Sequence, residues 1–350
     1  MPSLEVVPVR LRLRAPLRTA WGTLRERDLL RVRLVWGDGD EGLGEAAPLE
    51  PYDGVPLAAV AAALDAYAAV LRDAPDDAEP GDLLAACAAE RPLPQALAAV
   101  DLALWDRAGR RTGRPVAHLL AAGAATSVPV NATIGAEDRA GAARAARAAA
   151  DAGFGCVKVK VGVGDDAGRV AAVRAAVGPG VAIRVDANGA WSSAPEAVAN
   201  LRALAPALLE YAEEPVHGVA ALAEVRADSP VRVAMDETAA EPGAAGSGAA
   251  DAVCLKIARC GGISGLLRDA AAARTAGSDV YVASSFDGPL GIAAGVHAAA
   301  ALAATRAVPP CGLATLAMFE GTGDALAPRD GAIAVPSGPG LLDGTGTAAG

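Results

Sequence analysis

Lysines and acidic residues recur in the second half of the chain, each close to the end of a short apolar run. In chain order they are Lys158, Lys160, Asp186, Glu213, Asp236 and Lys256. Three carboxylates without a neighbouring His or Cys favour Mg²⁺ over zinc, with Mn²⁺ as the alternative metal. A divalent cation can hold a carboxylate and stabilise the enediolate that forms when a lysine removes a proton from the adjacent carbon. The residue types therefore indicate metal-dependent proton abstraction.

The spacing of these residues predicts the fold that positions them. On successive strands, these charged residues are separated by slightly fewer residues than the roughly 30 that one βα unit of a barrel contains. The candidate strands are 128–134, 156–161, 181–186, 208–213, 231–236, 252–257, 280–285 and, with the weakest pattern, 311–314. Amphipathic stretches between them, such as 139–152 and 167–177, predict helices. Alternating strands and helices describe a (β/α) barrel or an open doubly wound sheet.

Alternation along the strands places the charged side chains together. Residues two apart on a strand point to the same face, so Lys158 and Lys160 share a face. The same holds for Arg184, Asp186 and Asn188. Barrel enzymes build their active sites at the carboxyl ends of the strands. Because buried lysines and carboxylates need partners, we expect the lysines and acids to contact each other, a metal ion, or both.

The first part of the chain has a different pattern. Alternating apolar and polar residues at 4–13, 29–36 and 41–47 predict three strands, and the segments 57–72, 81–89 and 93–110 predict helices. Strands followed by helices form an α+β unit. The last residues are rich in Gly and Pro and are expected to pack back on this unit. We therefore predict an α+β capping domain of residues 1–125, completed by 315–350, and a barrel of residues 126–314.

Composition limits the partners of the protein. A formal net charge of −10 argues against nucleic acid, although local positive charge still permits a small-molecule carboxylate substrate. The start of the chain has no apolar signal-peptide core, and no apolar run reaches the ~20 residues of a membrane span. Five scattered cysteines without a CxxC pair fit a reducing compartment. We expect a cytoplasmic protein without membrane contacts, and a homo-oligomer stays an open alternative.

The charged segments resemble the enolase superfamily, in its muconate-lactonising branch. The matching segments are Lys158-Val159-Lys160, Asp186-Ala187-Asn188, Glu213-Glu214-Pro215, Asp236-Glu237 and Lys256. Gly44-Glu45-Ala46-Ala47-Pro48 is similar to a signature of the capping domain in that branch. The resemblance implies a modified (β/α)7β TIM-type barrel with an α+β capping domain.

The resemblance also implies a role for each matching residue. The metal ligands would be Asp186, Glu213 and Asp236. The catalytic lysines would be Lys160 as the base, Lys256 on the opposite side of the substrate, and Lys158 as the residue that tunes Lys160. Support for the metal site would come from Arg184, Asn188 and Glu237. Substrate contacts are expected from Ser284, Ser285, Asp287, from Trp21 in a cap loop, and from Gly262, which could cradle an anion. The cap loops 19–22 and 48–53 would close over the substrate.

Two activities of this branch compete. One is o-succinylbenzoate synthase, a dehydratase and lyase of menaquinone synthesis; the other is an isomerase, either dipeptide epimerase or N-succinylamino-acid racemase. Residues 284–291 and 311–313 resemble the synthase, and residues 313–316 lack the Asp-x-Asp pair usual in dipeptide epimerases. Residues 44–48 and 259–262 resemble epimerases as well. The synthase is our first expectation, the isomerase is the alternative, and a non-catalytic metal-binding barrel is a more distant one.

Overall fold

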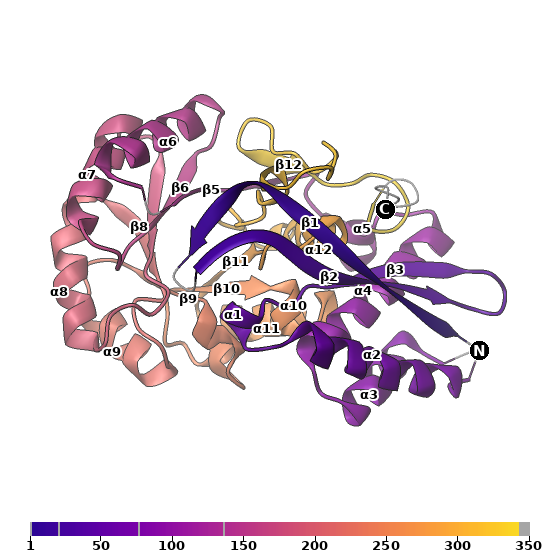
Figure 1. The fold of residues 1–350 in the computed structure, drawn as a ribbon. Coiled ribbons are helices and arrows are strands. Elements are labelled where there is room, and N and C mark those ends of the chain that lie inside the picture. Colours follow the sequence, from indigo (N-terminus) through magenta and orange to yellow (C-terminus); the bar gives the residue numbers. More distant parts are fainter. Residues whose placement is uncertain (1, 20–21, 76–77, 136, 343–350) are drawn as a thin grey trace.

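The computed structural model describes residues 2–19, 22–75, 78–135 and 137–342. Its fold class is the one predicted: a curled parallel sheet surrounded by helices, together with an antiparallel three-stranded sheet and its own helices. Figure 1 shows the second sheet (indigo) lying across the barrel strands. The cap residue Tyr52 contacts Lys256, which is the last residue of a barrel strand.

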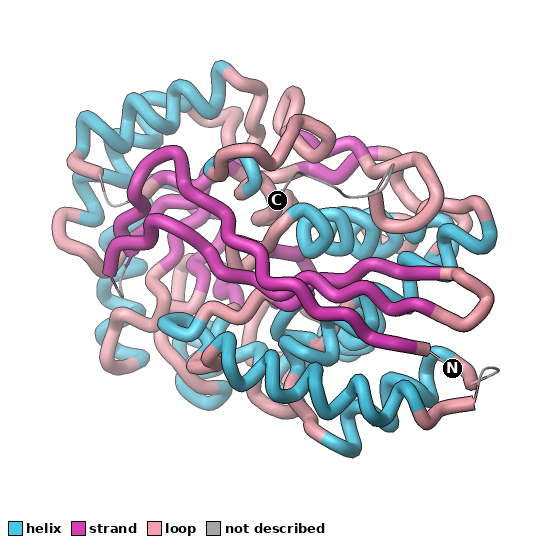
Figure 2. The backbone as a smooth tube through the Cα atoms, turned by 45° about the vertical axis from the view of Figure 1, so that its right-hand side comes forward, coloured by secondary structure: helices cyan, strands magenta, loops and turns pink. Residues whose placement is uncertain are grey.

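The cap is built on a long hairpin. Its strands are β1 (Ser3–Thr19), β2 (Gly22–Val35) and β3 (Glu41–Ala46), paired antiparallel in that order. Strands β1 and β2 continue well beyond β3, and their free end extends toward the barrel (Figures 1 and 2). The cap helices are α1 (Glu50–Asp53), α2 (Leu57–Arg72), α3 (Pro80–Glu90), α4 (Pro94–Thr112) and α5 (Val116–Leu120).

Strand β3 lies directly on helix α4. A Cβ added to Gly42 would lie 1.9 Å from the carbonyl oxygen of Ala103, and one added to Gly44 would lie 1.9 Å from that of Ala99. Real Cβ atoms cannot come this close to a backbone oxygen, so both positions need glycine. The two glycines thus allow backbone-to-backbone packing in the cap core.

The barrel sheet has seven parallel strands in sequential order. They are β5 (Ala132–Ile134), β6 (Cys156–Lys160), β7 (Ala182–Asp186), β8 (Leu209–Glu213), β9 (Val233–Met235), β10 (Ala252–Lys256) and β11 (Asp279–Ala283). The helices of the barrel are α6 (Arg139–Asp151), α7 (Asp166–Val177), α8 (Ala194–Leu204), α9 (Val219–Asp228), α10 (Ile257–Cys260), α11 (Ile263–Thr275) and α12 (Pro289–Ala303). Short 3₁₀ turns are η1 (Ala205–Ala207), η2 (Glu237–Ala240), η3 (Ala244–Gly246) and η4 (Leu316–Met318).

The predicted cap strands 4–13 and 29–36 are longer in the structure, at Ser3–Thr19 and Gly22–Val35, and two predicted barrel strands differ in their pairing. The segment 128–134 divides into β4 (Ser127–Pro129), which pairs antiparallel with β12 (Ala332–Ala334), and β5. The predicted strand 311–314 is reduced to two parallel bridges, Val130 with Cys311 and Ala283 with Gly312. These bridges connect β11 to the residues just before β5, so the curled sheet closes around the segment that the sequence pattern indicated most weakly.

Side-chain caps and burial explain the helices between the strands. Asp138, Asp165 and Ser193 each accept a hydrogen bond from a backbone N–H in the first turn of the following helix. Helix α12 is buried along most of its length. Among the residues that the structure describes, no helix combines the length and apolar character needed to cross a membrane.

Candidate active site

Strand register brings the charged residues to one end of the barrel. Lys158 lies opposite Arg184, and Lys160 lies opposite Asp186, in the pairing of β6 with β7. Asp186 in turn lies opposite Glu213 in the pairing of β7 with β8. Since the strands are parallel, their carboxyl ends meet at the same edge of the sheet.

The lysines and carboxylates contact each other, as we expected from their burial. The Nζ of Lys158 lies 2.8 Å from Glu213 Oε1 and 2.9 Å from Asp186 Oδ2. Lys160 Nζ lies 2.6 Å from the same oxygen of Asp186. On the other side, Lys256 Nζ lies 2.5 and 2.6 Å from the two oxygens of Asp236.

Strand order determines which side of the cluster each lysine occupies. Lys160 is carried by β6 and Lys256 by β10, and the strands between them end at or just before Asp186, Glu213 and Asp236. The acids therefore lie between two lysines. A substrate held over the acids would have one ammonium group on each side.

The charges shift one another's ionisation. Burial alone would raise the pKa of Asp186, but the ammonium groups of Lys158 and Lys160 hold that pKa below its usual value. Burial would lower the pKa of Lys158 and of Lys256, but the neighbouring carboxylates outweigh burial and raise both. Burial, with the charge of Asp236 added, raises the pKa of Glu237 to about 8. The lysines in this arrangement are ion-pair partners of the acids.

The donor set fits a divalent cation. Glu213, Asp236 and Cys254 each offer a ligand atom, and these atoms all lie within 4.8 Å of one another. Asp186, a predicted ligand, lies outside this group and shares the ammonium of Lys158 with Glu213, whereas Cys254 was not expected in the group. The three carboxylates are 1 to 3% exposed and are paired with lysines, and their oxygens are ligands that suit Mg²⁺ or Mn²⁺. These residues could therefore hold the predicted metal.

Asn188 links the base side of the cluster to Glu237. Its Oδ1 accepts a hydrogen bond from Lys160 Nζ at 2.7 Å, and its Nδ2 donates to Glu237 Oε1 at 2.9 Å. Asn188 has a positive φ of 46°, which lets the chain turn at the strand end. Both residues thus lie beside Lys160, and their support of the metal site stays a prediction.

Arg184 lies deeper in the barrel than we expected for metal-site support. It is fully buried, and it donates to Glu210 Oε2 at 2.7 Å and to the carbonyl of Pro310 at 2.6 Å. It reaches the cluster only through Tyr281, whose ring lies 4.8 Å from the guanidinium carbon and whose hydroxyl donates to Glu213 Oε2 at 2.7 Å. The reason is the strand rise: Arg184 precedes Asp186 by two residues and so lies one side-chain layer lower.

Glu214 and Tyr281 are site residues that sequence reasoning did not identify. The buried carboxylate of Glu214 accepts from the backbone N–H of Asp236 at 2.7 Å and from that of Thr238 at 3.0 Å. It thereby fixes the backbone that carries a proposed ligand. The Glu-Glu-Pro segment contained this signal, since adjacent residues of a strand end point to different sides.

The cap contributes Tyr52, which was also missed. Its hydroxyl lies 2.5 Å from Lys256 Nζ, 2.9 Å from Arg259 Nη1 and 3.1 Å from Asp236 Oδ1. The ring also lies beneath the ammonium, with its centroid 4.5 Å from Lys256 Nζ. The predicted cap loop 48–53 thus reaches the barrel mouth. In the other loop, Trp21 and Ala20 lie outside the described residues.

Of the predicted substrate contacts, Ser284 and the position of Gly262 have other partners in the structure. Ser284 shares a hydrogen bond of 2.8 Å with Thr315 Oγ1, while Ser285 and Asp287 are 3% and 1% exposed beneath the cap. Gly262 does not leave an open anion cradle, because Asp101 of α4 takes that place and accepts from Ser264 N at 3.1 Å. The carboxylate of Asp101 therefore accepts a hydrogen bond from the first turn of α11.

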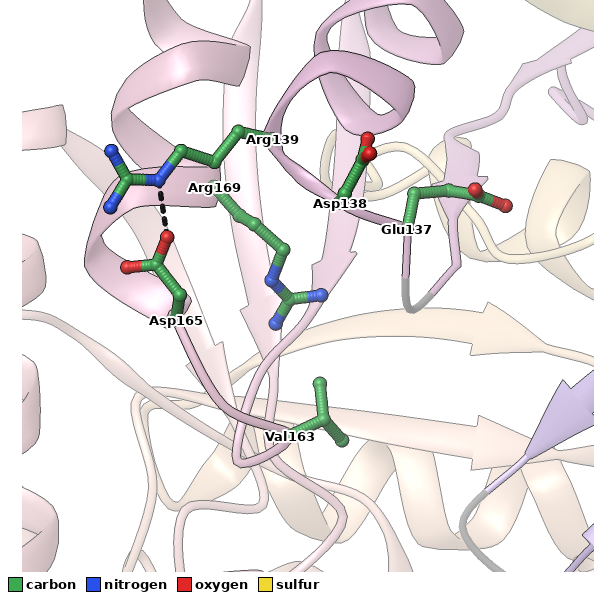
Figure 3. A pocket seen from close by; sticks show the side chains of 6 residues that line it. All are labelled: Glu137, Asp138, Arg139, Val163, Asp165 and Arg169. Atoms are coloured by element: carbon green, nitrogen blue, oxygen red, sulfur yellow. Dashed lines mark hydrogen bonds and ion pairs between the residues drawn. The ribbon is translucent and has the colours of Figure 1, made fainter.

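A pocket of about 250 Å³ opens beside the cluster. It lies between the loops that follow β5 and β6, on the same end of the barrel as Lys160. Figure 3 shows Arg139 and Asp165 paired across one side of it. Its lining residues are Glu137, Asp138, Arg139, Val163, Asp165 and Arg169. None of these lining residues belongs to the charged cluster itself.

Two family models match the chain. One, described as Enolase C-terminal domain-like, matches residues 141–342. The other, described as Mandelate racemase / muconate lactonizing enzyme, N-terminal domain, matches residues 1–121. Together they cover both the barrel and the cap.

Similar proteins carry more than one activity. An o-succinylbenzoate synthase of Mycobacterium bovis is 46% identical over 159 residues, which are 44% of this chain and 47% of that protein. The chain thus matches about half the length of this curated relative. The L-Ala-D/L-Glu epimerase of Bacillus subtilis, solved with a substrate, has a TM-score of 0.87 and 27% identity over 97% of both chains. A dipeptide epimerase of Methylococcus capsulatus, solved with Mg and L-Arg-D-Lys, has a TM-score of 0.86 and 27% identity over 97% of this chain and 98% of that one.

Proposed function

This chain belongs to the enolase superfamily, and from that premise we propose that it is a Mg²⁺-dependent enzyme that removes the proton next to a substrate carboxylate. We assign the metal to Asp186, Glu213 and Asp236, and the base to Lys160. The observation that carries the proposal is the placement of buried acids between two lysines on β6 and β10. The partner would be a small-molecule carboxylate in the cytoplasm, with no nucleic acid and no membrane.

The side chains divide the work of this reaction. A bound divalent cation would supply electrostatic stabilisation for the carboxylate as it becomes an enediolate. The carboxylates that would hold the cation are the ones that Lys158 and Lys160 contact. Lys160 then accepts the proton, while Asn188 holds its Nζ at 2.7 Å. Tyr52 and Lys256 close the opposite side and exclude water from it.

The first candidate reaction is o-succinylbenzoate synthesis, within menaquinone biosynthesis. It is supported by the 46% identity over 159 residues to the mycobacterial synthase. A syn dehydration needs one acid–base residue. Lys160 takes the α-proton and returns a proton to the departing hydroxide, which leaves as water from the same face. Lys256 then contributes only positive charge from the other face.

The second candidate is an epimerase or racemase. The specific observation in its favour is Lys256, which lies across the acids from Lys160 and could return a proton to the opposite face of the same carbon. The likeness to the Bacillus subtilis epimerase over 97% of both chains agrees with it. The absence of an Asp-x-Asp pair from residues 313–316 argues against dipeptides as the substrate.

The test is a comparison of substrates with Mg²⁺ present. We expect turnover of 2-succinyl-6-hydroxy-2,4-cyclohexadiene-1-carboxylate, and slower or no racemisation of N-succinyl amino acids and L-Ala-L-Glu. Turnover of only the latter two would overturn the synthase and leave the two-lysine chemistry standing. If no bound carboxylate takes up deuterium from heavy water, the barrel binds metal without catalysing proton abstraction. We also keep, as a proposal, the division into a cap of residues 1–125 with 315–350 and a barrel of 126–314.

A further inference from the structure

Arg27 of β2 lies between the cap and the barrel. Its side chain is almost fully buried, with 4% of the residue exposed. The guanidinium donates to the carbonyl oxygens of Ala47 at 3.2 Å and Pro48 at 2.6 Å, in the segment that follows β3. It also donates to the carbonyl oxygens of Ser285 at 3.2 Å and Phe286 at 3.3 Å, in the segment that follows β11. One side chain thus joins three parts of the chain.

Each of the joined segments leads directly to the site. The segment after β3 continues into α1, which carries Tyr52 to Lys256. The segment after β11 contains residues 284–288, which connect the seventh barrel strand to α12. Arg27 itself lies on the strand that leads to the free end of the cap hairpin. The three segments that would cover a substrate are therefore joined by the guanidinium of Arg27.

A second cap residue fixes the same barrel segment. Glu45 of β3 is 4% exposed and accepts a hydrogen bond of 2.7 Å from the N–H of Gly288, at the start of α12. A Cβ on Gly288 would lie 2.3 Å from Glu45 Oε2, so the glycine makes room for the carboxylate. The cap therefore supplies both a donor and an acceptor to residues 285–288.

The buried charges near Arg27 are matched. Asp287 is 1% exposed, and among the described residues neither of its carboxylate oxygens has a hydrogen-bond partner of ordinary geometry. Its strongest favourable charge interaction is with Arg27. The carboxylate of Asp287 thereby keeps the guanidinium from being an uncompensated buried charge.

We propose that Arg27 is a positioning residue for the reaction: by binding four carbonyl oxygens it holds the segment of Tyr52 and the segment after β11 as one unit over Lys256. A guanidinium can do this because it offers five N–H donors in a planar fork, whereas a lysine offers three donors from one atom. The role in catalysis rests on the proposed function, but the joining of the two segments does not.

Hydrogen exchange measured by mass spectrometry tests the joining without any substrate. Both segments contain hydrogen-bonded amides, such as Gly54 N to Glu50 O and Ile292 N to Gly288 O. In Arg27→Met, we expect residues 49–54 and 285–292 to exchange about tenfold faster or more, because bonds from a charged donor are lost. Barrel strands β6 to β8 should not change. Faster exchange in one segment only, or throughout the protein, would overturn the proposal.

Two further variants sharpen the exchange experiment. Arg33→Met removes a charge from the same strand, but Arg33 pairs with Glu5 and Glu41 at the surface, so both segments should exchange as in the wild type. Arg27→Lys keeps the positive charge but loses the planar set of five N–H donors. The exchange rates of both segments should therefore lie between those of the wild type and of Arg27→Met. A lysine variant identical to the wild type would show that charge alone suffices, which contradicts the proposal.

A double-mutant cycle tests the positioning role in turnover. Arg27→Met and Tyr52→Phe should each lower kcat/KM, and the double variant should be little worse than Arg27→Met if Arg27 acts through Tyr52. Additive losses would mean that Arg27 supports only the general stability of the cap. If the wild type turns over none of the substrates named above, the proposed function fails, and the exchange experiment still decides whether Arg27 joins the segments.

Discussion

The hydroxyl of Tyr52 lies 2.5 Å from the Nζ of Lys256, although the two residues belong to different parts of the fold. Tyr52 is in the short cap helix α1, and Lys256 ends barrel strand β10. The contact means that the barrel does not complete the site alone. The cap supplies the group that fixes the lysine on one side of the acids.

Tyr52→Phe should lower activity without unfolding the protein. The change removes a hydroxyl that bonds Lys256, Arg259 and Asp236, and it keeps the ring under the ammonium. We expect a loss of roughly tenfold in kcat/KM, the usual size for one hydrogen bond to a charged group. Tyr67→Phe is the matched control, since the Tyr67 hydroxyl bonds Arg91 within the cap. Equal effects of the two changes would contradict a role for Tyr52 at the site.

The two lysines should separate the candidate reactions. Lys160→Ala removes the base, so either reaction should fall by about 10²–10⁴-fold. Lys256→Arg keeps a positive charge but does not exchange protons near neutral pH. It should retain part of a dehydration and abolish racemisation. The measurements are turnover of the cyclohexadiene substrate and loss of optical rotation of N-succinyl amino acids. A full loss of dehydration in correctly folded Lys256→Arg would count against the one-lysine mechanism.

Metal removal should abolish activity reversibly. Excess EDTA should stop turnover, and added Mg²⁺ should restore it, because the three carboxylates are the proposed ligands. Asp236→Asn should weaken Mg²⁺ binding in calorimetry, whereas Asp151→Asn, on the surface of α6, should not. Binding of Mg²⁺ to Asp236→Asn with unchanged affinity would place the metal elsewhere.

Stability should fall with rising pH because of Glu45. Burial, and then the charge of Asp287, raise the pKa of Glu45 from 4.5 to about 7. The folded protein therefore binds this proton more tightly than the unfolded chain, and the free energy of unfolding decreases as the pH rises from about 4.5 to about 7. For a shift of this size the contribution is about 3 kcal/mol.

Glu45→Gln should remove that decrease. Glutamine can still accept from Gly288, and it carries no charge toward Asp287. Urea unfolding near pH 5 and near pH 8 should show the variant gaining stability relative to the wild type at the higher pH. Glu41→Gln, at the end of the same strand and paired with Arg33 near the surface, is the control and should show no such gain. The same pH slope in wild type and Glu45→Gln would show that Glu45 is ionised in the folded protein throughout this range.

The alternation of apolar and polar residues was enough to predict which residues lie at the carboxyl ends of the barrel strands. Lys160 and Asp186 each end a strand, and period-two alternation gives their face. The pattern failed at 128–134 because two strands of different sheets follow one another without a turn. It was weakest at 311–314, where only Cys311 and Gly312 bridge neighbouring chain segments.

Residues that act across the cap–barrel boundary could not be predicted in this way. Arg27 is one of several arginines in a charged strand, and nothing near it in sequence distinguishes it from Arg25 or Arg31. Its role depends on carbonyl oxygens about 20 and about 260 residues away. Gly262 shows the opposite error: the local pattern indicated an anion site, and a distant carboxylate of the same chain, Asp101, fills it.

The contacts of the segment Gly44–Pro48 limit how the cap can be exchanged in protein engineering. Gly44 lets β3 touch the backbone of α4, Glu45 reaches the first turn of α12, and the carbonyl of Pro48 is bound by Arg27. Glu45 thus joins the cap to the barrel directly, and Pro48 does so through Arg27, which also binds Ser285 and Phe286. A chimera that exchanges caps between relatives would have to bring the beginning of α12 with the new cap, or rebuild it to match.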